Sequence, residues 1–191
     1  IVQVMGGDIA RLVWTDPPYG VKLGVGVPLD NPQHWVVRSI KNDDLSPEQL
    51  LELIFTVLKH CAEFTSPGAS IYMAAPSGNM LPVLLNSFND SGFTFHWNLV
   101  WVKDQLVFGR GDYHMKHENI LYGWKPDGAH YFVDDRKQTS VFEYPRPKIS
   151  KEHPTMKPVE LIEHMIRNSS ESDDIILEPF SGSGSTIIAC E

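Results

Sequence analysis

A short apolar run near the start of the chain ends in two consecutive prolines, and this feature limits the fold most strongly. Residues 9–14 (IARLVW) are apolar and β-prone, and Asp16-Pro17-Pro18-Tyr19 follows almost directly. Proline has a fixed φ and no N–H donor, so a central strand cannot continue through two of them. We therefore predict a buried strand over residues 9–14 with its exit turn at the prolines.

Helix and strand patterns alternate along the rest of the chain. Ser46-Pro47-Glu48-Gln49 combines an N-cap, a proline at the first helical position and a capping box. The helix predicted there runs to about Phe64, with an inward face of Leu51, Ile54, Phe55, Leu58 and Ala62. Further helices are predicted over 79–91, from Lys157-Pro158 onward with Leu161, Ile162, Met165 and Ile166 inward, and after Gly184.

Four further strands are predicted, at 69–74, 93–103, 119–125 and 174–180. Pro67-Gly68 is predicted to turn the chain, and residues 20–44 and 126–149 are expected to be irregular. Strands that alternate with helices indicate an α/β fold with a mostly parallel sheet. The 191 residues are enough for one domain with a proper core, so we expect a single domain over 1–191.

Composition excludes some classes of protein. No apolar run is long enough for a transmembrane helix, and no signal peptide is visible. The only cysteines, Cys61 and Cys190, form no CxxC pair, which favours a reduced, cytoplasmic protein without a metal site. The net charge of −8 argues against a generally basic coat for nucleic acid. Residues 103–157 are nevertheless net basic, with ten Lys and Arg against eight Asp and Glu.

The first proline turn suits the amino group of a flat heterocycle. Asp16 and the Pro17 carbonyl are acceptors for the two hydrogens of such an amine. Tyr19 offers a ring on which the heterocycle stacks. The alternative is a proline turn with an aspartate cap, which is common for any two of these residues.

A second turn that could bind a ligand is Glu178-Pro-Phe-Ser-Gly-Ser-Gly-Ser185. Taken alone, it is weaker evidence for a binding site than the proline turn. Its two glycines allow a close approach of the backbone to a ligand, but Ile187 replaces the third glycine of the dinucleotide fingerprint. The alternative is a tight connection from strand to helix, with Glu178 as a structural acid at the end of the strand.

Together these motifs resemble the DNA amino-methyltransferases, whose catalytic motif is Asp-Pro-Pro-Tyr. EPFSGSGS (178–185) is similar to their cofactor turn, and HPTMKPVELIEHMIRNS (153–169) to the segment that precedes it. WVKDQLVFGRGDYHMKHENILYGWK (101–125) is similar to the hairpin region of phage and prophage members. The catalytic motif comes first and the cofactor motif last, which is the permuted order of the beta group. The resemblance covers nearly the whole chain.

The resemblance implies a Rossmann-like S-adenosylmethionine-dependent methyltransferase sheet in permuted motif order. It assigns the target base to Asp16, Pro17, Pro18 and Tyr19. It assigns the cofactor, S-adenosylmethionine, to Asp16, Thr155, Lys157, Pro158, Glu178, Phe180, Ser181, Gly182 and Gly184. Glu178 and Ser181 depart from the more usual Asp and Gly. The family places two further strands after the last helix, so we expect a chain that is truncated at its C-terminus and incomplete at both ends.

The implied reaction is transfer of a methyl group to the exocyclic amine of a flipped-out adenine in double-stranded DNA. Candidate DNA contacts are Arg110, His114, Lys116, Arg136, Lys137, Arg146 and Lys148. Tyr122 and Trp124 are candidates for a second wall of the base site, with core or hairpin packing as an equal alternative. The resemblance places the protein in the cytoplasm of a bacterium or a phage-infected cell and leaves a homodimer open.

Three other functions remain open. The first is methylation of cytosine N4, although Asp-Pro-Pro-Tyr leans to adenine and Ser-Pro-Pro-Tyr to cytosine. The second is a protein glutamine methyltransferase, which uses Asn-Pro-Pro-Tyr with the motifs in the opposite order. The third is an inactive fragment that only binds DNA.

Overall fold

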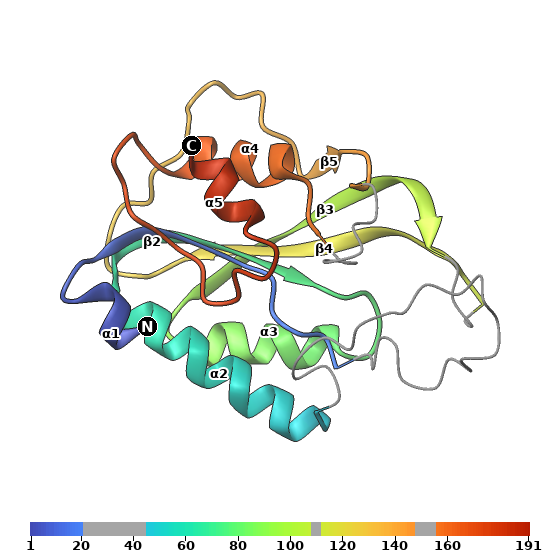
Figure 1. Cartoon of the computed structure of the whole chain (residues 1–191), viewed down its shortest axis with the longest axis horizontal. Helices are drawn as coiled ribbons and strands as arrows, with labels where there is room; N and C mark the ends of the chain where they lie inside the picture. The colour runs from blue at the N-terminus through green and yellow to red at the C-terminus, as the bar shows by residue number, and fades with distance from the viewer. Residues whose placement is uncertain (21–44, 108–111, 148–155) are drawn as a thin grey trace.

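The computed structural model describes residues 1–20, 45–107, 112–147 and 156–191. Within them a six-stranded sheet has the order β5-β3-β4-β2-β1-β6 and carries helices on both faces (Figure 1). In chain order the elements are α1 (Val2–Met5), β1 (Ala10–Thr15), α2 (Pro47–Glu63), β2 (Thr65–Ala75), α3 (Leu81–Asp90), β3 (Thr94–Val107), β4 (Met115–Trp124), β5 (Val141–Glu143), α4 (Val159–Ser169), β6 (Ile176–Leu177) and α5 (Ser185–Cys190). None of the helices in these ranges is long and apolar enough to cross a membrane.

Only β4 runs against the other strands of this sheet. β1 pairs in parallel with β2 and β6, and β3 pairs in parallel with β5. β4 is antiparallel to both of its neighbours, β2 and β3. The α/β class and the mostly parallel strand direction are therefore confirmed, and the sheet is mixed because the β3–β4 hairpin reverses one strand.

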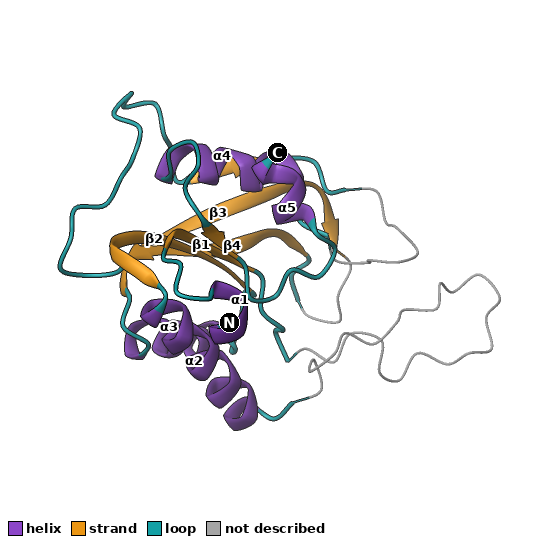
Figure 2. Ribbon diagram, turned by 60° about the vertical axis from the view of Figure 1, so that its left-hand side comes forward, coloured by secondary structure: helices purple, strands orange, loops and turns teal. Residues whose placement is uncertain are grey.

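Two apolar layers hold the helices against the sheet. α2 and α3 cover one face and α4 and α5 the other, which the turned view also shows (Figure 2). Along β1, Val13 faces the layer below α2 and α3, while Leu12 and Trp14 face α4. Successive side chains of a strand point to opposite faces, so β1 is apolar throughout because both of its faces are covered.

The predicted capping box at the start of α2 is present. The Ser46 hydroxyl accepts from the Gln49 N–H at 3.3 Å, and the Gln49 side chain accepts from the Ser46 N–H at 3.0 Å. The predicted inward face was wrong by one position at this end, because Leu50 is buried and Leu51 is exposed. Leu50, Ile54, Leu58 and Cys61 form the buried stripe.

β2 is longer than predicted. The expected turn at Pro67-Gly68 is wrong, because both residues lie inside the strand. Gly68 has φ +78° and donates its N–H to the Lys125 carbonyl, and the pairing with β1 shifts register in this part of the strand. Glycine at positive φ thus makes an irregularity in a continuous strand rather than a turn.

β5 and β6 also differ from the prediction. β5 lies in the region expected to be irregular, and it forms because Val141–Glu143 pairs with β3. β6 is only two residues long, whereas a strand over 174–180 was expected. Its apolar run is cut short by Pro179, and its observed pairing is limited to Leu12 and Val13 of β1.

The partly buried carboxylate of Glu178 holds the connection between β6 and α5. Glu178 accepts the Phe180 N–H at 2.8 Å and the Thr186 hydroxyl at 3.2 Å. Burial raises the pKa of Glu178 to about 8, against the lowering effect of the Phe180 N–H, and the negative charge of Asp16 adds to the rise. Glu178 therefore has a structural role at the strand end, and its predicted contact with the cofactor stays a prediction.

The raised pKa of Glu178 predicts how stability responds to pH. Below the unfolded pKa of about 4.5 the group is protonated in both states, and above about 8 it is ionised in both. Between these values only the unfolded chain is ionised, so rising pH costs the folded state stability. Glu178→Gln should therefore be more stable than the parent at pH 8.5, by about 1.4 kcal/mol or more, since each pKa unit is worth about that much.

Urea unfolding at pH 4.5 and pH 8.5 measures this difference. The difference in free energy of unfolding between variant and parent should be smaller at pH 4.5 than at pH 8.5. The same difference at both pH values would contradict an acid with a raised pKa at this position.

The irregularity in β2 predicts an unequal effect of two matched glycine substitutions. Gly68 and Gly78 both have positive φ, but a Cβ at Gly68 would collide with the Ala129 backbone, whereas one at Gly78 meets no atom within 4 Å. Gly78→Ala should cost about 1–2 kcal/mol from the left-handed backbone alone. Gly68→Ala should cost about 1–3 kcal/mol more because of the collision. Equal losses in denaturant unfolding would show that the segments of Gly68 and Ala129 are not packed together.

Candidate active site at the ends of β1 and β6

The two turns predicted to carry chemistry lie side by side at one edge of the sheet. β1 and β6 are parallel neighbours, with Leu12 opposite Ile176 and Val13 opposite Leu177. Their carboxyl ends therefore open at the same edge, which is where parallel α/β sheets bind ligands. Asp16 follows β1 and Glu178 follows β6, so the fold brings together motifs that are far apart in the sequence.

Asp16 is held by a hydroxyl and an ammonium group. The Tyr19 hydroxyl donates to Oδ1 at 3.0 Å, and Lys157 Nζ donates to Oδ2 at 2.7 Å. The side chain remains 26% exposed, so it is oriented from within and still open to solvent. Each carboxylate oxygen has two acceptor positions, so Asp16 can accept a further hydrogen from a ligand.

Lys157 lies at the centre of a buried network of charges. Its Nζ contacts Glu118 Oε2 at 3.3 Å as well as Asp16, and Glu118 Oε1 in turn accepts from Lys103 Nζ at 2.6 Å. Burial opposes the charge on Lys157, but Asp16 and Glu118 outweigh it and raise the pKa of the ammonium group. Burial also opposes ionisation of Glu118, but Lys157 and Lys103 outweigh it and lower the pKa of this carboxyl to about 2.

Lys103 and Glu118 are functional candidates that the sequence did not reveal. They come from facing strands of the hairpin, where Trp101 is opposite Glu118. Lys103 is two residues beyond Trp101 and therefore projects from the same face. Knowledge of the register of β3 and β4 would have paired the two side chains. The sequence alone determines neither this register nor the contact between Glu118 and Lys157.

The ammonium group of Lys157 lies against the ring of Tyr19, which is the predicted stacking surface. Lys157 Nζ lies 5.4 Å from the ring centroid, within the range of a cation–π contact. Burial and then the charges of Asp16 and Glu118 raise the pKa of the phenol, which keeps Tyr19 neutral. Its hydroxyl is a donor to Asp16, so the ring is fixed in place beside the carboxylate.

Both glycines of the turn after β6 have a left-handed backbone. Gly182 has φ +45° and Gly184 has φ +77°, and the Gly184 N–H donates to the Ser181 carbonyl at 2.7 Å. A Cβ at Gly184 would meet no atom within 4 Å, so the chain leaves open space beside it. Phe180 is half-buried at the start of this turn and packs against the core.

Tyr122 and Trp124 do not form a second wall for a ligand beside Asp16. Trp124 is opposite Ser70, towards the start of β2, whereas the site lies beyond the end of β1. Trp124 is instead stacked between His96 and His130, with ring centroids at 3.4 and 3.7 Å. Tyr122 is buried and stacks on Tyr72, so the packing alternative is the correct one for both residues.

The predicted DNA contacts do not all lie at this edge. His114 and Lys116 are exposed at the start of β4, a few residues before Glu118. Arg136 and Lys137 lie in the segment between Val133 and Gln138, which contacts α4 at Asn168 and His164. Lys157, which precedes α4, is at the other end of this helix. Arg110, Lys148 and the predicted cofactor residue Thr155 lie outside the described residues, while Pro158 is buried at the start of α4.

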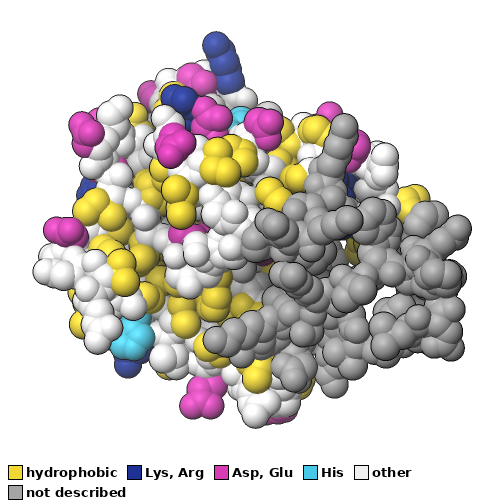
Figure 3. Space-filling view, in the orientation of Figure 1, with side chains coloured by type: hydrophobic (Ala, Val, Ile, Leu, Met, Phe, Trp, Pro, Cys, Tyr) yellow, Lys and Arg dark blue, Asp and Glu magenta, His cyan; other side chains and the backbone are white. Residues whose placement is uncertain are grey.

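The surface over α4 is mainly acidic. Acidic side chains gather over this part of the face in Figure 3, with basic ones between them. The segment 158–191 carries one basic residue against seven acidic ones, which agrees with this view. A DNA backbone is therefore not expected to lie across α4.

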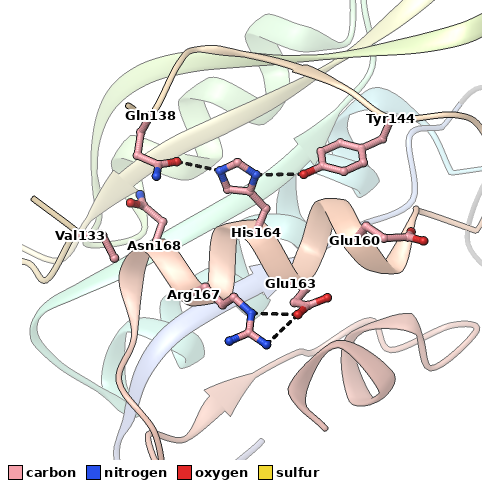
Figure 4. Close-up of a pocket in the computed structure, with 8 residues that line it drawn as sticks. All are labelled: Val133, Gln138, Tyr144, Glu160, Glu163, His164, Arg167 and Asn168. Atoms are coloured by element: carbon pink, nitrogen blue, oxygen red, sulfur yellow. Dashed lines mark hydrogen bonds and ion pairs between the residues drawn. The ribbon is translucent and has the colours of Figure 1, made fainter. Parts of the chain in front are cut away.

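A separate polar pocket of about 390 Å³ lies between α4 and the segment before β5. It is lined by Val133, Gln138, Tyr144, Glu160, Glu163, His164, Arg167 and Asn168. His164 bridges Tyr144 and Gln138 at 2.9 and 2.7 Å (Figure 4). The pocket shares no lining residue with the predicted site, and its polar groups serve to join α4 to the neighbouring segment.

Comparisons with known proteins match this arrangement. The type II methyltransferase M.HpaI of Haemophilus parainfluenzae is 27% identical in an alignment of 201 positions that covers 94% of this chain and 60% of M.HpaI. M2.DpnII of Streptococcus pneumoniae is 27% identical in an alignment of 192 positions that covers 92% of this chain and 71% of that protein. The chain thus spans about 60% of the length of M.HpaI.

Solved structures share the fold over the whole chain. M1.HpyAVI, solved as a complex with SAM, has a TM-score of 0.68 at 21% identity and matches all of this chain and 82% of its own. The cytosine-N4-specific PvuII DNA methyltransferase has a TM-score of 0.70 at 14% identity, over 98% of this chain and 74% of its own. The family model of the N6/N4 DNA methylases matches residues 10–191. The chain therefore belongs to the N6/N4 DNA methylase family.

Proposed function

We propose that this chain is the catalytic part of a site-specific DNA methyltransferase that transfers a methyl group from S-adenosylmethionine to the exocyclic amine of a flipped-out adenine. The observation that carries the proposal is the position of Asp16-Pro17-Pro18-Tyr19. This turn lies at the end of β1, directly beside the glycine turn that follows β6. An acceptor for an amine and an open backbone turn thus share one edge of the sheet.

The residues at this edge fit the cofactor. The carboxylate of Asp16 and the acid Glu178 are suited to positive groups such as a sulfonium and an ammonium. Lys157 is suited to a carboxylate. Gly184 leaves open space beside the backbone, and half-buried Phe180 offers an apolar surface next to it. Family membership and the SAM complex of the structural neighbour M1.HpyAVI support the same cofactor.

When bound, S-adenosylmethionine supplies a methyl group on a positively charged sulfur. Asp16 accepts a hydrogen from the target amine and so directs the nitrogen lone pair towards that methyl group. The same carboxylate stabilises the positive charge that develops on the nitrogen. Tyr19 and Lys157 hold Asp16 in a single orientation, so the amine is positioned before the reaction begins. The excess proton leaves the nitrogen after transfer.

DNA is the proposed substrate because the matched family is one of DNA methylases. A target amine inside a duplex is out of reach, so the base has to leave the stack and enter the edge of the sheet. The ring of Tyr19 is the proposed stacking surface for it. The same family match favours DNA over glutamine side chains of proteins.

Cytosine N4 is the second candidate target. The fold is shared with a cytosine-N4-specific enzyme at a TM-score of 0.70, so the shape of the sheet does not favour either base. The preference for adenine rests on Asp16 at the first position of the motif. We propose the recognition of a specific sequence by analogy with the type II relatives.

The first experiment is transfer of labelled methyl from S-adenosylmethionine to unmethylated plasmid DNA, followed by nucleoside digestion and mass analysis. We expect methyladenine as the product. Methylcytosine would move the assignment to the second candidate. Binding of the cofactor without any transfer to DNA would contradict the proposed reaction for this chain.

Asp16→Ala should lower the rate of transfer by about 100-fold or more, since the loss of a group that stabilises developing charge costs this much. Binding of S-adenosylmethionine, measured by calorimetry, should weaken much less than transfer does, because the other residues assigned to the cofactor remain. Glu163→Gln is the matched control, because Glu163 pairs with Arg167 on α4, in the pocket that shares no residue with this site. Transfer at the parent rate in Asp16→Ala would remove Asp16 from the mechanism.

Tyr19→Ala and Tyr19→Phe separate the ring from its hydroxyl. Loss of the ring should cost about 1–3 kcal/mol of base stacking, which is about 5- to 150-fold in the rate at limiting DNA. Tyr19→Phe keeps the ring and loses the hydroxyl that contacts Asp16 at 3.0 Å and Glu118 at 3.5 Å, so its loss of rate should be smaller. Equal losses in steady-state kinetics would argue against stacking on this ring.

A further inference from the structure

A second carboxylate, Glu118, binds the same two groups that hold Asp16. Its Oε2 lies 3.3 Å from Lys157 Nζ and 3.5 Å from the Tyr19 hydroxyl, whose single hydrogen is directed mainly to Asp16. Asp16 binds these groups at 2.7 and 3.0 Å. Both partners of Asp16 are thus shared with a residue that comes from the hairpin, 102 positions further along the chain.

We propose that Glu118, anchored by Lys103, is a positioning residue for methyl transfer, because it sets where Lys157 and Tyr19 hold the Asp16 carboxylate. This inference rests on the proposed function and concerns the same site. Glu118 does not need to touch the substrate, since it acts through the two side chains that contact Asp16.

Stability alone does not account for this network. Lys103 and Lys157 are each 7% exposed and Glu118 is 20% exposed, so three charges are largely removed from water. Buried ion pairs cost nearly as much in desolvation as they return, and apolar side chains often replace them without loss. Strongly perturbed charges beside a ligand edge are more typical of a functional site.

Lys103 determines which oxygen of Glu118 faces the site. Its Nζ binds Oε1 at 2.6 Å, which leaves Oε2 for Lys157 and Tyr19. Lys103 and Glu118 both stand on the paired strands β3 and β4, so the anchor is built on rigid backbone. A positioning group is most effective when its own orientation is fixed in this way.

The charges also balance. Among the described residues, Lys103 and Lys157 face Asp16 and Glu118, Tyr19 is neutral, and Glu178 lies beyond Asp16 with a raised pKa. Removing Glu118 leaves two ammonium groups with one carboxylate. Lys157 would then depend on Asp16 alone and draw this carboxylate away from its acceptor role.

The first test measures Lys157 without any reaction. In protein labelled with ¹⁵N-lysine, NMR follows the protected side-chain ammonium signals, assigned by their loss in Lys103→Met and Lys157→Met. At neutral pH, Glu118→Gln should shift the Lys157 ammonium signal and speed the exchange of its hydrogens with water, because one of its two charged partners is lost. Glu163→Gln should leave both unchanged. An unchanged signal and exchange rate in Glu118→Gln would overturn the shared hold on Lys157.

The second test measures catalysis. Glu118→Gln should lower kcat about 100-fold, the effect of a small misplacement of a reacting group, while the Kd of S-adenosylmethionine stays close to that of the parent. A parent-like kcat would overturn the positioning role. A parent chain that transfers no methyl group overturns the proposed function instead, and the NMR measurement still decides whether Glu118 holds Lys157.

The double variant Lys103→Met/Glu118→Gln separates positioning from charge balance. It restores a neutral network with one ammonium and one carboxylate, so thermal stability should recover towards that of the parent. Because Lys157 and Tyr19 still lack Glu118, kcat should remain low. Recovery of kcat together with stability would show that the pair serves only to balance charge.

Discussion

The ion pair between Lys157 and Asp16 joins the parts of the chain on which the site depends. It connects the turn after β1 to the residue before α4, 141 positions away, at 2.7 Å. Through Glu118 the same ammonium reaches the β3–β4 hairpin. The turn after β1, the start of α4 and the β3–β4 hairpin are thus held together at one edge of the sheet. Because Lys157 is buried, this arrangement holds only while both carboxylates are present, since an unpaired buried charge is strongly destabilising.

The direction of the strands explains why polar and charged side chains gather at the edge that holds Asp16 and Glu178. β1 and β6 are parallel, so the proline turn and the glycine turn leave the sheet on the same side. β4 is the only reversed strand among those described, and its reversal brings the beginning of this strand, rather than its end, to that side. Glu118 is near the beginning of β4, whereas Trp124 is at its end. The same reversal therefore places Glu118 at the site and removes Trp124 from it.

Local sequence patterns predicted the structural features that depend only on neighbouring residues. The capping box at Ser46 and the strand that ends at the prolines follow from neighbouring residues. The features that were missed depend on pairing between distant segments. Pro67-Gly68 stays inside β2 because Lys125 accepts the Gly68 N–H, and β5 exists because β3 lies beside it. Lys103 and Glu118 meet for the same reason, since only the register of the hairpin brings them together.

On the proposed function, the titration of Glu178 would respond to a cationic ligand. Lys103 and Lys157 are balanced by Asp16 and Glu118, and Glu178, with a pKa of about 8, is mostly protonated at neutral pH. A cation at this edge would lower the pKa of Glu178 and favour its ionisation. On the proposed function, the edge would thus gain a negative charge as a positive ligand enters, while Asp16 stays bound to Lys157 and Tyr19. Glu178 replaces the aspartate that is more usual at this position. The replacement preserves this response, because glutamate has the same carboxyl group on a side chain that is one methylene longer.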